Sequence, residues 1–568
     1  MWSAFKRLFR KKTKGGEIYP DEIFLDAQNL PAFDKNQFEG RLEKPISRRA
    51  IAMVGLVFLS GAALFGVRSW NLQVVHGKAY ALRSEQNRLR HILIFGERGA
   101  IYDRHDELLV SNIPNTDPAN FSIRSYPTSG GFSHLLGYVG YPSKDSAGFY
   151  YTSNIEGEEG IEKFYNAALA GKNGVELIEI NALGKIETES VIYPPQNGDN
   201  LHLSVDREVQ EKLYGEIESL AKQVGFEGGA GVIIDVESGE ILAMTSYPEY
   251  DSGVIADGSD ETTISKYLTD SKKPFLDRAA SGLYTPGSIV KPFLAMGALE
   301  EGVIDPETSI LSTGSISIPN PFDKTKRSVF TDWKAHGYVD MRQALAVSSN
   351  VYFYEVGGGF EGQKGLGIAN IEKYMRLFGF GAEIPGQFFG DKKGVLPNPE
   401  WKALNFDGEV WRIGDTYNTA IGQYGVQVTP LQAARAIAAI ANGGKLLNPS
   451  VLLGGSPDGR ISEVLPFTEG YFKVVQEGMR EAVLSGTAKG LDIPEVTVAA
   501  KTGTAELGSL KQYVNSWVIG FFPYEKPRYA FAVLMEKGPR DNLLGGLFVM
   551  RGMLDWMKVN APEYVTNP

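Results

Sequence analysis

Residues 50–67 constrain the fold of this chain more than any other segment, because they read AIAMVGLVFLSGAALFGV, eighteen residues without a charged side chain. A run of this length can cross the hydrocarbon core of a bilayer as one helix. A buried helix in a soluble core is the alternative. Charged residues border the run, Arg49 before it and Arg68 after it, and we therefore expect a membrane-spanning helix.

The charges around this run predict its direction. Five Lys or Arg residues lie within the fifteen residues before it and two within the fifteen after it. By the positive-inside rule, the N-terminus faces the cytoplasm and the larger part of the chain lies outside. A cleaved signal peptide is the other alternative, but the forty-nine residues before the run are too many for its charged leader region. We expect an uncleaved single-pass anchor.

Composition narrows the class of protein further. The net charge is −11, with +4 in residues 1–49 and −15 in the remainder, so the body of the chain does not suit nucleic acid. Cysteine is absent and histidine occurs six times, never in an HExxH pair. These counts exclude thiolate metal sites, iron–sulfur clusters and cysteine nucleophiles. We expect no metal and no cofactor.

The chain divides at a glycine-rich stretch, residues 225–231. Before it, strand-like runs at 91–95 and 201–205 and a helical pattern at 207–224 predict a β-rich stalk. After it, residues 231–246 predict a hairpin of two strands. Further on we expect helices at 340–356, 430–442 and 469–485 and strands at 496–500, 516–522 and 529–535. Because these strands cluster at both ends with helices between them, we expect an α+β domain.

Ser288 is the candidate nucleophile. It stands three residues before Lys291, and on a helix this spacing brings the amine within reach of the hydroxyl as a base. A Pro-Gly turn precedes it, so we expect Ser288 in the opening turn, where free N–H groups can stabilise an oxyanion. The spacing alone is a weak signal, because the chain repeats it at Ser3/Lys6 and Ser219/Lys222.

Two further motifs strengthen the assignment. Ser348 and Asn350 form S-x-N, and residues 501–504 read K-T-G-T after a β-branched run. Each alone has an ordinary structural explanation, such as a helix cap, an exposed lysine or a turn at a strand end. The set S-x-x-K, S-x-N and K-T-G in this order is typical of serine acyltransferases of the penicillin-recognising kind.

These residue types suit the chemistry of acyl transfer. A lysine base must be partly neutral, and Lys501 is a neighbouring cation that would lower the pKa of Lys291. Ser348 can pass a proton and Asn350 can orient the base and a substrate amide. The third motif suits binding, since glycine lets a substrate backbone approach a strand edge and the two threonine hydroxyls suit a carboxylate.

A Ser-His-Asp hydrolase is the competing class of enzyme. After residue 226 the only histidine is His336, and no G-x-S-x-G elbow precedes it. The strained turn that presents the serine in that class is therefore missing from the pattern. We expect a hydrogen-bonded structural role for His336.

With its three motifs, almost the whole chain after residue 50 resembles a class B penicillin-binding protein, a membrane-anchored peptidoglycan transpeptidase. RGAIYDR at 98–104, HLLGY at 134–138 and GIEKFY at 160–165 resemble the juxtamembrane and pedestal motifs of the family. GVLPNPEWK at 394–402 and WRIGDTYNTAIGQ at 411–423 resemble the elongation-type penicillin-binding protein 2 subgroup. The chain departs from the family pattern at two places, His105-Asp106 and Tyr424, where a polar residue with glycine and a glycine are usual.

The resemblance implies a penicillin-binding transpeptidase fold, an α+β domain whose antiparallel sheet has helices on both sides. An elongated β-rich pedestal and one transmembrane helix precede it. The implied organisation is a cytoplasmic basic tail at 1–49, the transmembrane helix at 50–67, a dimerisation-like pedestal at 68–225, the transpeptidase domain at 226–560 and a C-terminal tail at 561–568. Some elongation-type members hold zinc with cysteine and histidine; without cysteine, we expect none here.

The resemblance also implies a mechanism. Ser288 attacks the penultimate D-Ala carbonyl of a stem peptide and expels the terminal D-Ala, and an amine from a neighbouring strand resolves the acyl-enzyme. N–H groups of Ser288 and Thr504 form the oxyanion hole. The implied residues are the catalytic Ser288, Lys291 as base, Ser348 as relay, Asn350 as orienting group and Lys501, and the substrate-binding Thr502, Gly503 and Thr504.

Partners and location follow from the same resemblance. It implies covalent inhibition by β-lactams, the bacterial inner membrane, a role in elongation and cell shape, and a polytopic SEDS-family glycosyltransferase of the RodA type as the polymerase. Three alternatives stay open: a D,D-carboxypeptidase or β-lactamase-like hydrolase in which water is the acceptor, a β-lactam sensor, and a scaffold that mainly activates the glycosyltransferase.

Overall fold

The computed structural model describes residues 47–78, 89–115, 121–145, 150, 152–180, 186–323, 325–385, 392–508 and 510–566. Most of the expected cytoplasmic tail and the last two residues of the expected C-terminal tail lie outside these ranges. The chain divides into two units, residues 1–89 and 90–568.

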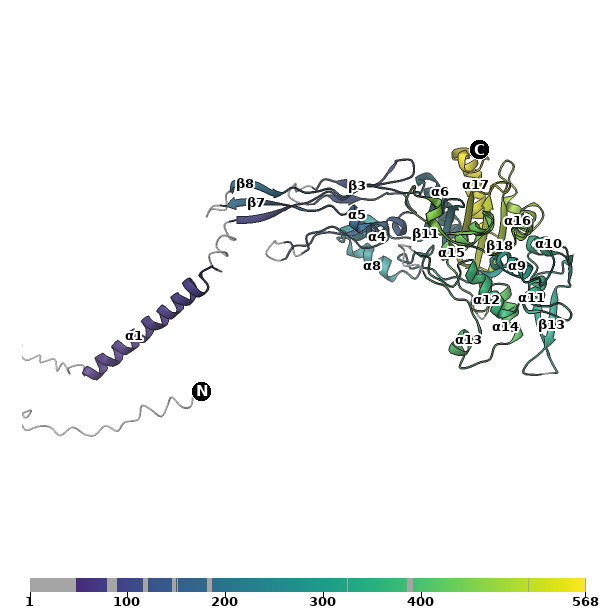
Figure 1. Cartoon of the computed structure of the whole chain (residues 1–568), viewed down its shortest axis with the longest axis horizontal. Helices are drawn as coiled ribbons and strands as arrows, with labels where there is room; N and C mark the ends of the chain where they lie inside the picture. Colours follow the sequence, from purple (N-terminus) through teal and green to yellow (C-terminus); the bar gives the residue numbers. More distant parts are fainter. Residues whose placement is uncertain are drawn as a thin grey trace, which may run out of the picture. The chain divides into compact units, whose positions relative to one another are not determined.

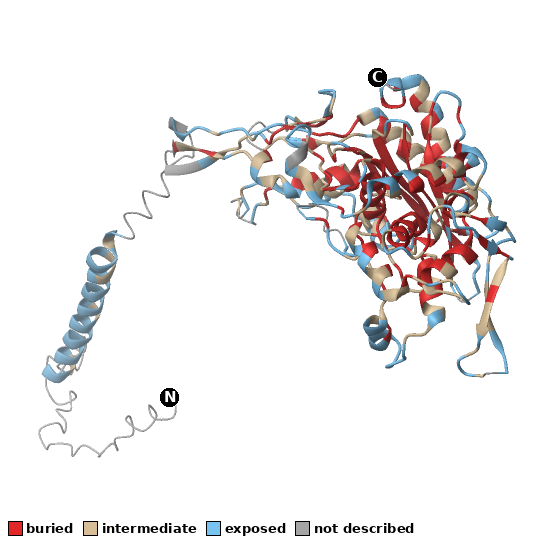
Figure 2. Ribbon diagram, turned by 45° about the vertical axis from the view of Figure 1, so that its right-hand side comes forward, coloured by how far each residue is buried: buried red, intermediate tan, exposed pale blue. Residues whose placement is uncertain are grey.

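The first unit contains the expected anchor. Helix α1 (Arg48–Trp70) begins at Ser47, whose hydroxyl accepts a hydrogen bond from the Ala50 N–H at 3.1 Å, and continues into a short π-helix (Asn71–Val75). It includes the expected span and is apolar enough to cross a membrane. None of its residues is buried, as its pale-blue ribbon shows (Figure 2). It therefore lacks the buried face that a core helix of a soluble protein would have.

The first part of the second unit is β-rich, as expected (Figure 1). One sheet has the order β1-β7-β8, a second β4-β3-β2-β9, and β5 pairs with β6. The strands are β1 (Leu89–Ile94), β2 (Ile101–Tyr102), β3 (Leu108–Ile113), β4 (Ile123–Ser125), β5 (Val139–Gly140), β6 (Glu156–Gly157), β7 (Gly174–Ile180), β8 (Ile186–Tyr193) and β9 (Leu201–His202), and the short helices are α3 (Ser133–Leu136), α4 (Gly160–Phe164) and α5 (Asn166–Leu169). We call this part the pedestal.

A buried ion network fixes the pedestal. Glu162 accepts a hydrogen bond from Arg98 Nε on one carboxylate oxygen, at 2.6 Å, and from Arg124 Nε on the other, at 2.8 Å. All three side chains are at most 1% exposed. The other guanidinium N–H groups of Arg98 and Arg124 donate hydrogen bonds to backbone carbonyls and to the side chains of Asn112 and Asn166. The network has a net charge of +1, and its two cations are held by the shared carboxylate and by the hydrogen bonds of their remaining N–H groups.

The second part is built on one antiparallel sheet with the order β11-β10-β20-β19-β18. Its strands are β10 (Gly228–Asp235), β11 (Ile241–Tyr247), β18 (Ala499–Leu507), β19 (Tyr513–Phe522) and β20 (Tyr529–Pro539). The expected hairpin is confirmed, since Val232 pairs with Met244 across β10 and β11. All three expected late strands are present, and β18 extends through the K-T-G-T motif.

Helices cover both faces of this sheet because its side chains alternate between two cores. On β20, Ala530, Ala532 and Leu534 belong to the core that contains α15 (Pro430–Ala441). Their neighbours Phe531, Val533 and Met535 belong to the core of α6 (Arg207–Val224) and α17 (Gly546–Asn560). Figure 2 shows these buried residues gathered around the sheet. The expected sheet with helices on both sides is confirmed.

Most expected helices are found within a residue or two, namely α6, α15 and α16 (Glu469–Leu484). The expected helix at 340–356 is two helices, α10 (Met341–Val347) and α11 (Asn350–Gly358). The helix is interrupted at Ser348, which has a left-handed φ of 59°. Ser349 then caps α11, because its side-chain oxygen accepts a hydrogen bond from the Tyr352 N–H. This break presents the S-x-N motif at a helix junction.

The remaining elements complete the second part. They are α7 (Ser252–Asp257), α8 (Glu261–Thr269), η5 (Gly287–Val290), α9 (Lys291–Glu300), β12 (Ile310–Ser312), β13 (Ser315–Pro319), β14 (Arg327–Thr331), β15 (Gly337–Val339), α12 (Gly367–Leu377), α13 (Pro399–Asn405), α14 (Ile413–Ala420), β16 (Lys445–Leu447), η6 (Pro457–Arg460), β17 (Ile461–Val464), η7 (Lys489–Leu491) and η8 (Pro562–Tyr564). Helix α6, which we expected to end the stalk, packs against β10 and β11. The domain borders stay a prediction.

Candidate active site

Ser288 lies in the 3₁₀ turn η5, which runs directly into α9. This turn packs so closely on β18 that glycine is required on both sides. A Cβ on Gly503 would stand 2.8 Å from the Pro286 carbonyl oxygen, and one on Gly287 would stand 2.9 Å from the Thr504 carbonyl oxygen. Gly287 also has a left-handed φ of 59°. The expected place of Ser288 in an opening turn is confirmed, and this turn holds Ser288 beside the K-T-G-T strand.

Two hydrogen bonds fix this turn from other elements. The Trp517 indole N–H on β19 donates to the Thr285 carbonyl at 3.0 Å, and the Gly287 N–H donates to the Gly422 carbonyl at 3.0 Å. Gly422 has no room for a side chain, because its Cβ would stand 2.1 Å from the Gly287 oxygen. The position of Ser288, the candidate nucleophile, therefore depends on β18, β19 and the loop after α14.

Lys291 is completely buried below this turn. Its Nζ donates to the Ser348 carbonyl and to Asn350 Oδ1, both at 2.8 Å, and lies 3.4 Å from Ser348 Oγ. Burial lowers the pKa of Lys291 to about 7, although the negative charge of Asp332 acts in the other direction and raises this pKa. About half of the amines at this pKa are neutral near pH 7, so Lys291 can accept a proton.

Lys501 approaches the same serine from β18. It is also fully buried, and its Nζ donates to Ser348 Oγ at 2.8 Å and to the Thr502 carbonyl at 2.8 Å. Burial and then the nearby Lys291 hold its pKa well below the ordinary value. The Ser348 hydroxyl thus lies between two amines, in the position that a proton relay between them needs.

Asp332 is a functional candidate that the motifs did not reveal. It accepts hydrogen bonds from Ser349 Oγ at 2.8 Å and from the Val351 N–H at 3.0 Å. Burial raises its pKa, but hydrogen bonds from the first N–H groups of α11 and from Ser349 outweigh this effect and leave the pKa below its ordinary value. Asp332 is therefore an anion that fixes the S-x-N junction. No spacing rule links residue 332 to this motif, because the β13–β14 hairpin brings it there.

Thr487 is the second residue that the sequence did not reveal. Thr502 Oγ1 donates to Thr487 Oγ1 at 2.8 Å, which orients the hydroxyl of the K-T-G-T motif. Thr487 follows α16 and also lines the cleft. A single threonine after a helix carries no sequence signal of this role.

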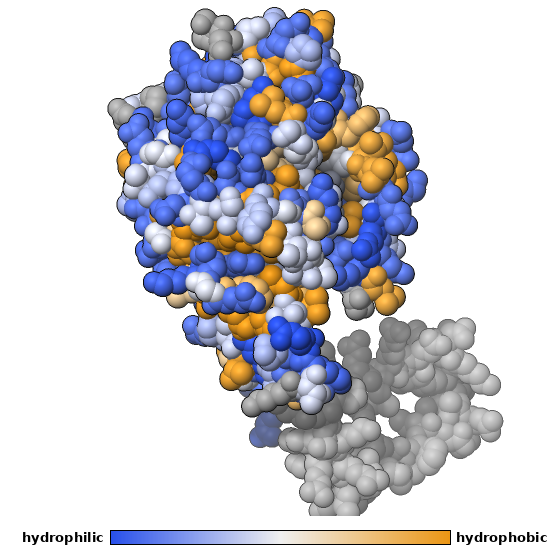
Figure 3. Space-filling model, turned by 90° about the vertical axis from the view of Figure 1, so that its right-hand side faces the viewer, coloured by the Kyte–Doolittle hydropathy of each residue, from blue (hydrophilic) through white to orange (hydrophobic). Residues whose placement is uncertain are grey.

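One open cleft of about 1060 Å³ joins the expected residues. Its walls include Ser288, Ser348, Asn350, Thr502, Gly503 and Thr504. The two lysines lie beneath its surface, where water does not reach them. The molecule's surface is mostly hydrophilic around separate apolar patches in the view of Figure 3. The structure brings all eight expected site residues together, while their catalytic roles stay a prediction.

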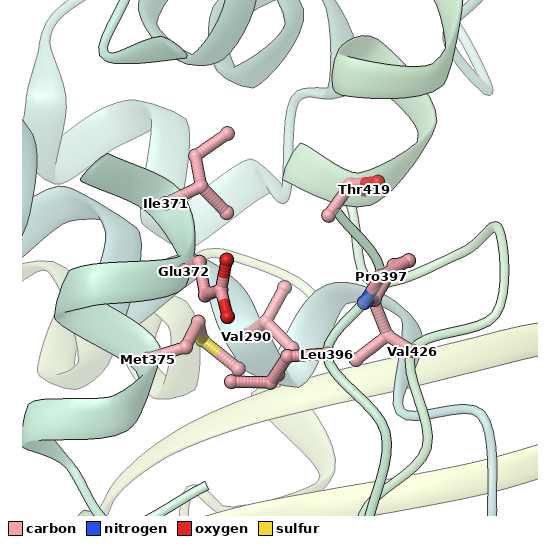
Figure 4. Close-up of a pocket in the computed structure, with 8 residues that line it drawn as sticks. All are labelled: Val290, Ile371, Glu372, Met375, Leu396, Pro397, Thr419 and Val426. Carbon is pink, nitrogen blue, oxygen red and sulfur yellow. The ribbon is translucent and has the colours of Figure 1, made fainter. Parts of the chain in front are cut away.

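Figure 4 shows a second cavity, which Val290 of η5 lines together with residues of four other segments, among them Ile371, Leu396 and Val426. Its volume is about 10 Å³, enough for about one water molecule. This cavity cannot hold a substrate, and the open cleft is the candidate site.

His336 has no place in this cleft. Its Nε2 lies 3.6 Å from Asp332 Oδ1, and the ring packs against Trp333. It is not among the described residues that line the cleft, so a Ser-His-Asp triad with Ser288 has no support. Within the described ranges, no three His, Asp or Glu side chains stand close enough together to hold a metal ion.

Comparison with known proteins gives concordant matches. The family model of the penicillin binding protein transpeptidase domain matches residues 229–546, and that of the penicillin-binding protein dimerisation domain matches residues 113–203. The peptidoglycan D,D-transpeptidase MrdA of Acinetobacter baumannii is 29% identical, over 90% of this chain and 87% of that protein. MrdA of Escherichia coli K12 is 27% identical, over 90% and 94%.

Solved structures agree with these relatives. Pseudomonas aeruginosa PBP2 in complex with WCK 5153 matches with a TM-score of 0.69 and 27% identity, over 84% of this chain and 98% of that one. A peptidoglycan synthase complex described as coordinating polymerization and crosslinking matches with 0.67 and 26%, over 89% and 97%. Helicobacter pylori PBP2 in complex with MreC matches with 0.66 and 28%, over 83% and 99%.

Proposed function

Since this chain belongs to the penicillin-binding protein transpeptidase family and is a peptidoglycan D,D-transpeptidase, we propose that Ser288 is its nucleophile and Lys291 its general base. The observation that carries this assignment is the shared cleft, in which Ser288 and the two other motifs stand above two buried lysines bridged by the Ser348 hydroxyl. A neutral Lys291 and a serine one helical turn away form the activated pair that acyl transfer needs.

In the first step, Ser288 Oγ attacks the carbonyl carbon of the penultimate D-Ala. A C–O bond forms, the C–N bond to the terminal D-Ala breaks, and the proton of Ser288 passes to Lys291. The departing amine takes up a proton through Ser348, which contacts both lysines. The N–H groups of Ser288 and Thr504 stabilise the oxyanion, because η5 packs directly on Thr504.

In the second step, an amine of a neighbouring strand attacks the ester and Ser288 leaves with a proton. Asn350 holds Lys291 in place for both steps through its 2.8 Å hydrogen bond. The hydroxyls of Thr502 and Thr504 receive the terminal carboxylate of the donor before it leaves, while the buried Lys501 keeps its hydrogen bond to Ser348 below them. Gly503 lets η5 pack directly on β18, because a Cβ there would stand 2.8 Å from the Pro286 carbonyl oxygen, and this packing keeps Ser288 beside the strand.

A labelled penicillin tests the nucleophile, because a β-lactam acylates the same serine. Mass spectrometry of wild type is expected to find the adduct on the peptide that contains Ser288, and Ser288→Ala is expected to lose it. The chain offers a matched control in Ser219, which has the same spacing to a lysine but lies exposed on α6, with Lys222 paired to Glu218. An adduct that persists in Ser288→Ala, or that is lost in Ser219→Ala, would refute the assignment.

The acceptor and the partner require separate tests. We infer elongation-type cross-linking in the bacterial inner membrane, with a cytoplasmic N-terminus and a RodA-type glycosyltransferase partner. The exposed apolar helix α1 and the relatives described as a peptidoglycan synthase complex and as a complex with MreC support this inference. Purified protein with that glycosyltransferase is expected to make cross-linked muropeptides, whereas a carboxypeptidase would only shorten stem peptides. Full rescue of a deletion strain by Ser288→Ala would favour the scaffold instead.

A further inference from the structure

The active-site cleft is bordered by two strand edges. Strand β18 is the edge of the five-stranded sheet, and in the described part of the chain β14 pairs with β13 alone. The β13–β14 hairpin projects from the rest of the domain near the label β13 (Figure 1). Val329 and Thr331 of β14 line the same cleft as Ser288 and Thr504. The hairpin therefore offers the cleft a second strand edge, which the proposed function leaves unused.

Two hydrogen bonds at the ends of the hairpin show which way the backbone of β14 faces. The Asn320 N–H donates to the Lys326 carbonyl at 3.0 Å, and the Asp332 N–H donates to the Gly314 carbonyl at 2.8 Å. The register runs one to one between these bonds, and bonded residues alternate along an antiparallel strand. The even-numbered residues of β14 therefore bond to β13. The odd-numbered Val329 turns its N–H and C=O away from β13.

The free edge of β14 is open at Val329. This residue is 59% exposed, and within the described ranges no other strand pairs with this edge. Farther along, the Thr331 carbonyl accepts hydrogen bonds from Tyr354 Oη at 3.2 Å and from Asn350 Nδ2 at 3.5 Å. An exposed edge with unused backbone groups is a template for another extended chain. An extended peptide can therefore be added at Val329, two residues from the contact of this edge with Asn350.

We propose that the free edge of β14 binds the acceptor peptide as an added strand and brings its amine to the acyl-enzyme. This inference rests on the proposed function, in which the donor lies along β18 and Ser288 carries the acyl group. One residue of the acceptor exchanges two backbone hydrogen bonds with Val329. Because cross-linking joins two peptides at one serine, two strand edges in one cleft give each peptide its own binding edge.

The acceptor residue that carries the amine suits the place opposite Val329. Side chains of directly paired residues lie on the same face of a sheet, so this side chain enters the cleft beside that of Val329. The contact between Thr331 and Asn350 lies roughly 6.8 Å farther along the strand, a distance that an extended side chain of lysine's length covers. There the amine attacks the acyl carbon. A C–N bond forms, the C–O bond to Ser288 breaks, and Ser288 Oγ takes up the proton that the amine loses.

The test lets two acceptors compete for one acyl-enzyme, which the full-length protein in detergent forms from a thioester donor. Both acceptors are peptides with a free amine on the side chain of a diamino residue, and in one of them the backbone nitrogen of that residue is methylated. The methyl group removes the N–H that would bond to the Val329 carbonyl. Mass spectrometry measures the ratio of the two transfer products. Wild type is expected to favour the unmethylated acceptor roughly tenfold, the effect of about two net backbone hydrogen bonds.

Val329→Pro removes the N–H of the free edge and leaves the bonds between its neighbours and β13 in place. The preference is expected to fall to about threefold or less. Ser317→Pro is the matched control. Ser317 stands directly opposite Val329 on β13, so its N–H points to the far edge of the hairpin, and it is not among the described residues that line the cleft. This variant is expected to keep the preference of wild type.

The outcomes separate the two proposals. Both products come from one acyl-enzyme, so their ratio does not depend on how much of a variant is folded, and labelled penicillin checks that Ser288 reacts. Equal use of the two acceptors by wild type, or an equal effect of Val329→Pro and Ser317→Pro, would overturn acceptor binding at β14, while penicillin labelling would leave the proposed function intact. Absence of labelling at Ser288 in wild type would overturn the proposed function and acceptor binding at β14 with it.

Discussion

The pedestal and the catalytic cleft each bury two cations, but they compensate them differently. In the pedestal, Arg98 and Arg124 share the carboxylate of Glu162. In the cleft, Lys291 and Lys501 share the neutral hydroxyl of Ser348. In the first arrangement, both guanidinium groups contact one shared anion and donate their remaining hydrogen bonds to neutral acceptors, which fixes the fold around a net charge of +1. In the second arrangement, the acceptors at hydrogen-bond distance of the two amines are neutral, so burial lowers both pKa values even against the charge of Asp332 and favours neutral amines.

The choice of cation follows this difference. Arginine does not lose its proton in proteins, so a buried arginine is tolerated only with an anion and a full set of acceptors. Lysine gives up its proton when burial makes the charge costly. The pedestal therefore uses the cation that fixes structure, and the active site uses the cation that exchanges protons.

Replacing Lys291 is expected to have the largest effect of the changes proposed for the two regions. Lys291→Met keeps a similar side-chain volume and is expected to lower the rate of penicillin acylation about 10³-fold, the contribution of a general base. The folded-state pKa of about 7 lies below the ordinary 10.5, so the unfolded chain binds this proton more tightly. Stability is therefore lost as the pH falls from about 10.5 to about 7, and the full cost of burying Lys291 is present at pH 7 and below. The variant is therefore expected to melt at a higher temperature than wild type at pH 7, and a lower melting temperature would contradict this account.

Removing the negative charge of Glu162 in the pedestal is expected to lower stability, the opposite of the effect expected for Lys291→Met. Glu162→Gln leaves two buried guanidinium groups without their anion and is expected to lower the free energy of unfolding by about 3–5 kcal/mol. Denaturant unfolding measures this loss. Glu307→Gln is the control, because Glu307 is a largely exposed partner of Arg342 and such pairs contribute about 1 kcal/mol or less. An equal loss of unfolding free energy in Glu162→Gln and Glu307→Gln would contradict the stabilising role of the buried carboxylate.

The pH profile of acylation tests whether the titration of Lys291 controls the rate. In the proposed mechanism the neutral form of Lys291 is the base, so the rate is expected to rise about tenfold per pH unit below the pKa of Lys291 and to level off above it. With a pKa of about 7, the midpoint falls near pH 7. Stopped-flow acylation between pH 5 and 9 measures the profile. A rate that is independent of pH in this range would exclude Lys291 as the titrating base.

Asp332 should give the smallest effect. Its negative charge raises the pKa of Lys291, so Asp332→Asn is expected to move the midpoint to lower pH, by about one unit or less. The asparagine can still accept the hydrogen bonds from Ser349 and Val351, which preserves the junction. A shift to higher pH would contradict the sign of this interaction.

The comparisons support the fold expected from the sequence, and the structure shows why local patterns sufficed. The hairpin at 231–246 and helix α6 follow from periodicity and turn residues, which act between near neighbours. The break at Ser348 escaped the helical pattern, because its left-handed φ is set by the junction of two packed helices. Residues 501–504 lie within β18 instead of after a strand, because β19 pairs with them along their whole length.

The sequence by itself determined the apolar segment and the α+β class, since these depend on residue type and on spacing along the chain. It also predicted the eight site residues, which the structure brings together at one cleft while their roles stay a prediction. Only the tertiary structure decided that Lys291 and Lys501 meet at Ser348, 57 and 153 residues away, and that Asp332 and Thr487 join them. The physical reason is that a pKa and a hydrogen bond depend on burial and contact in space. Distant segments acquire both only when they pack around a common core.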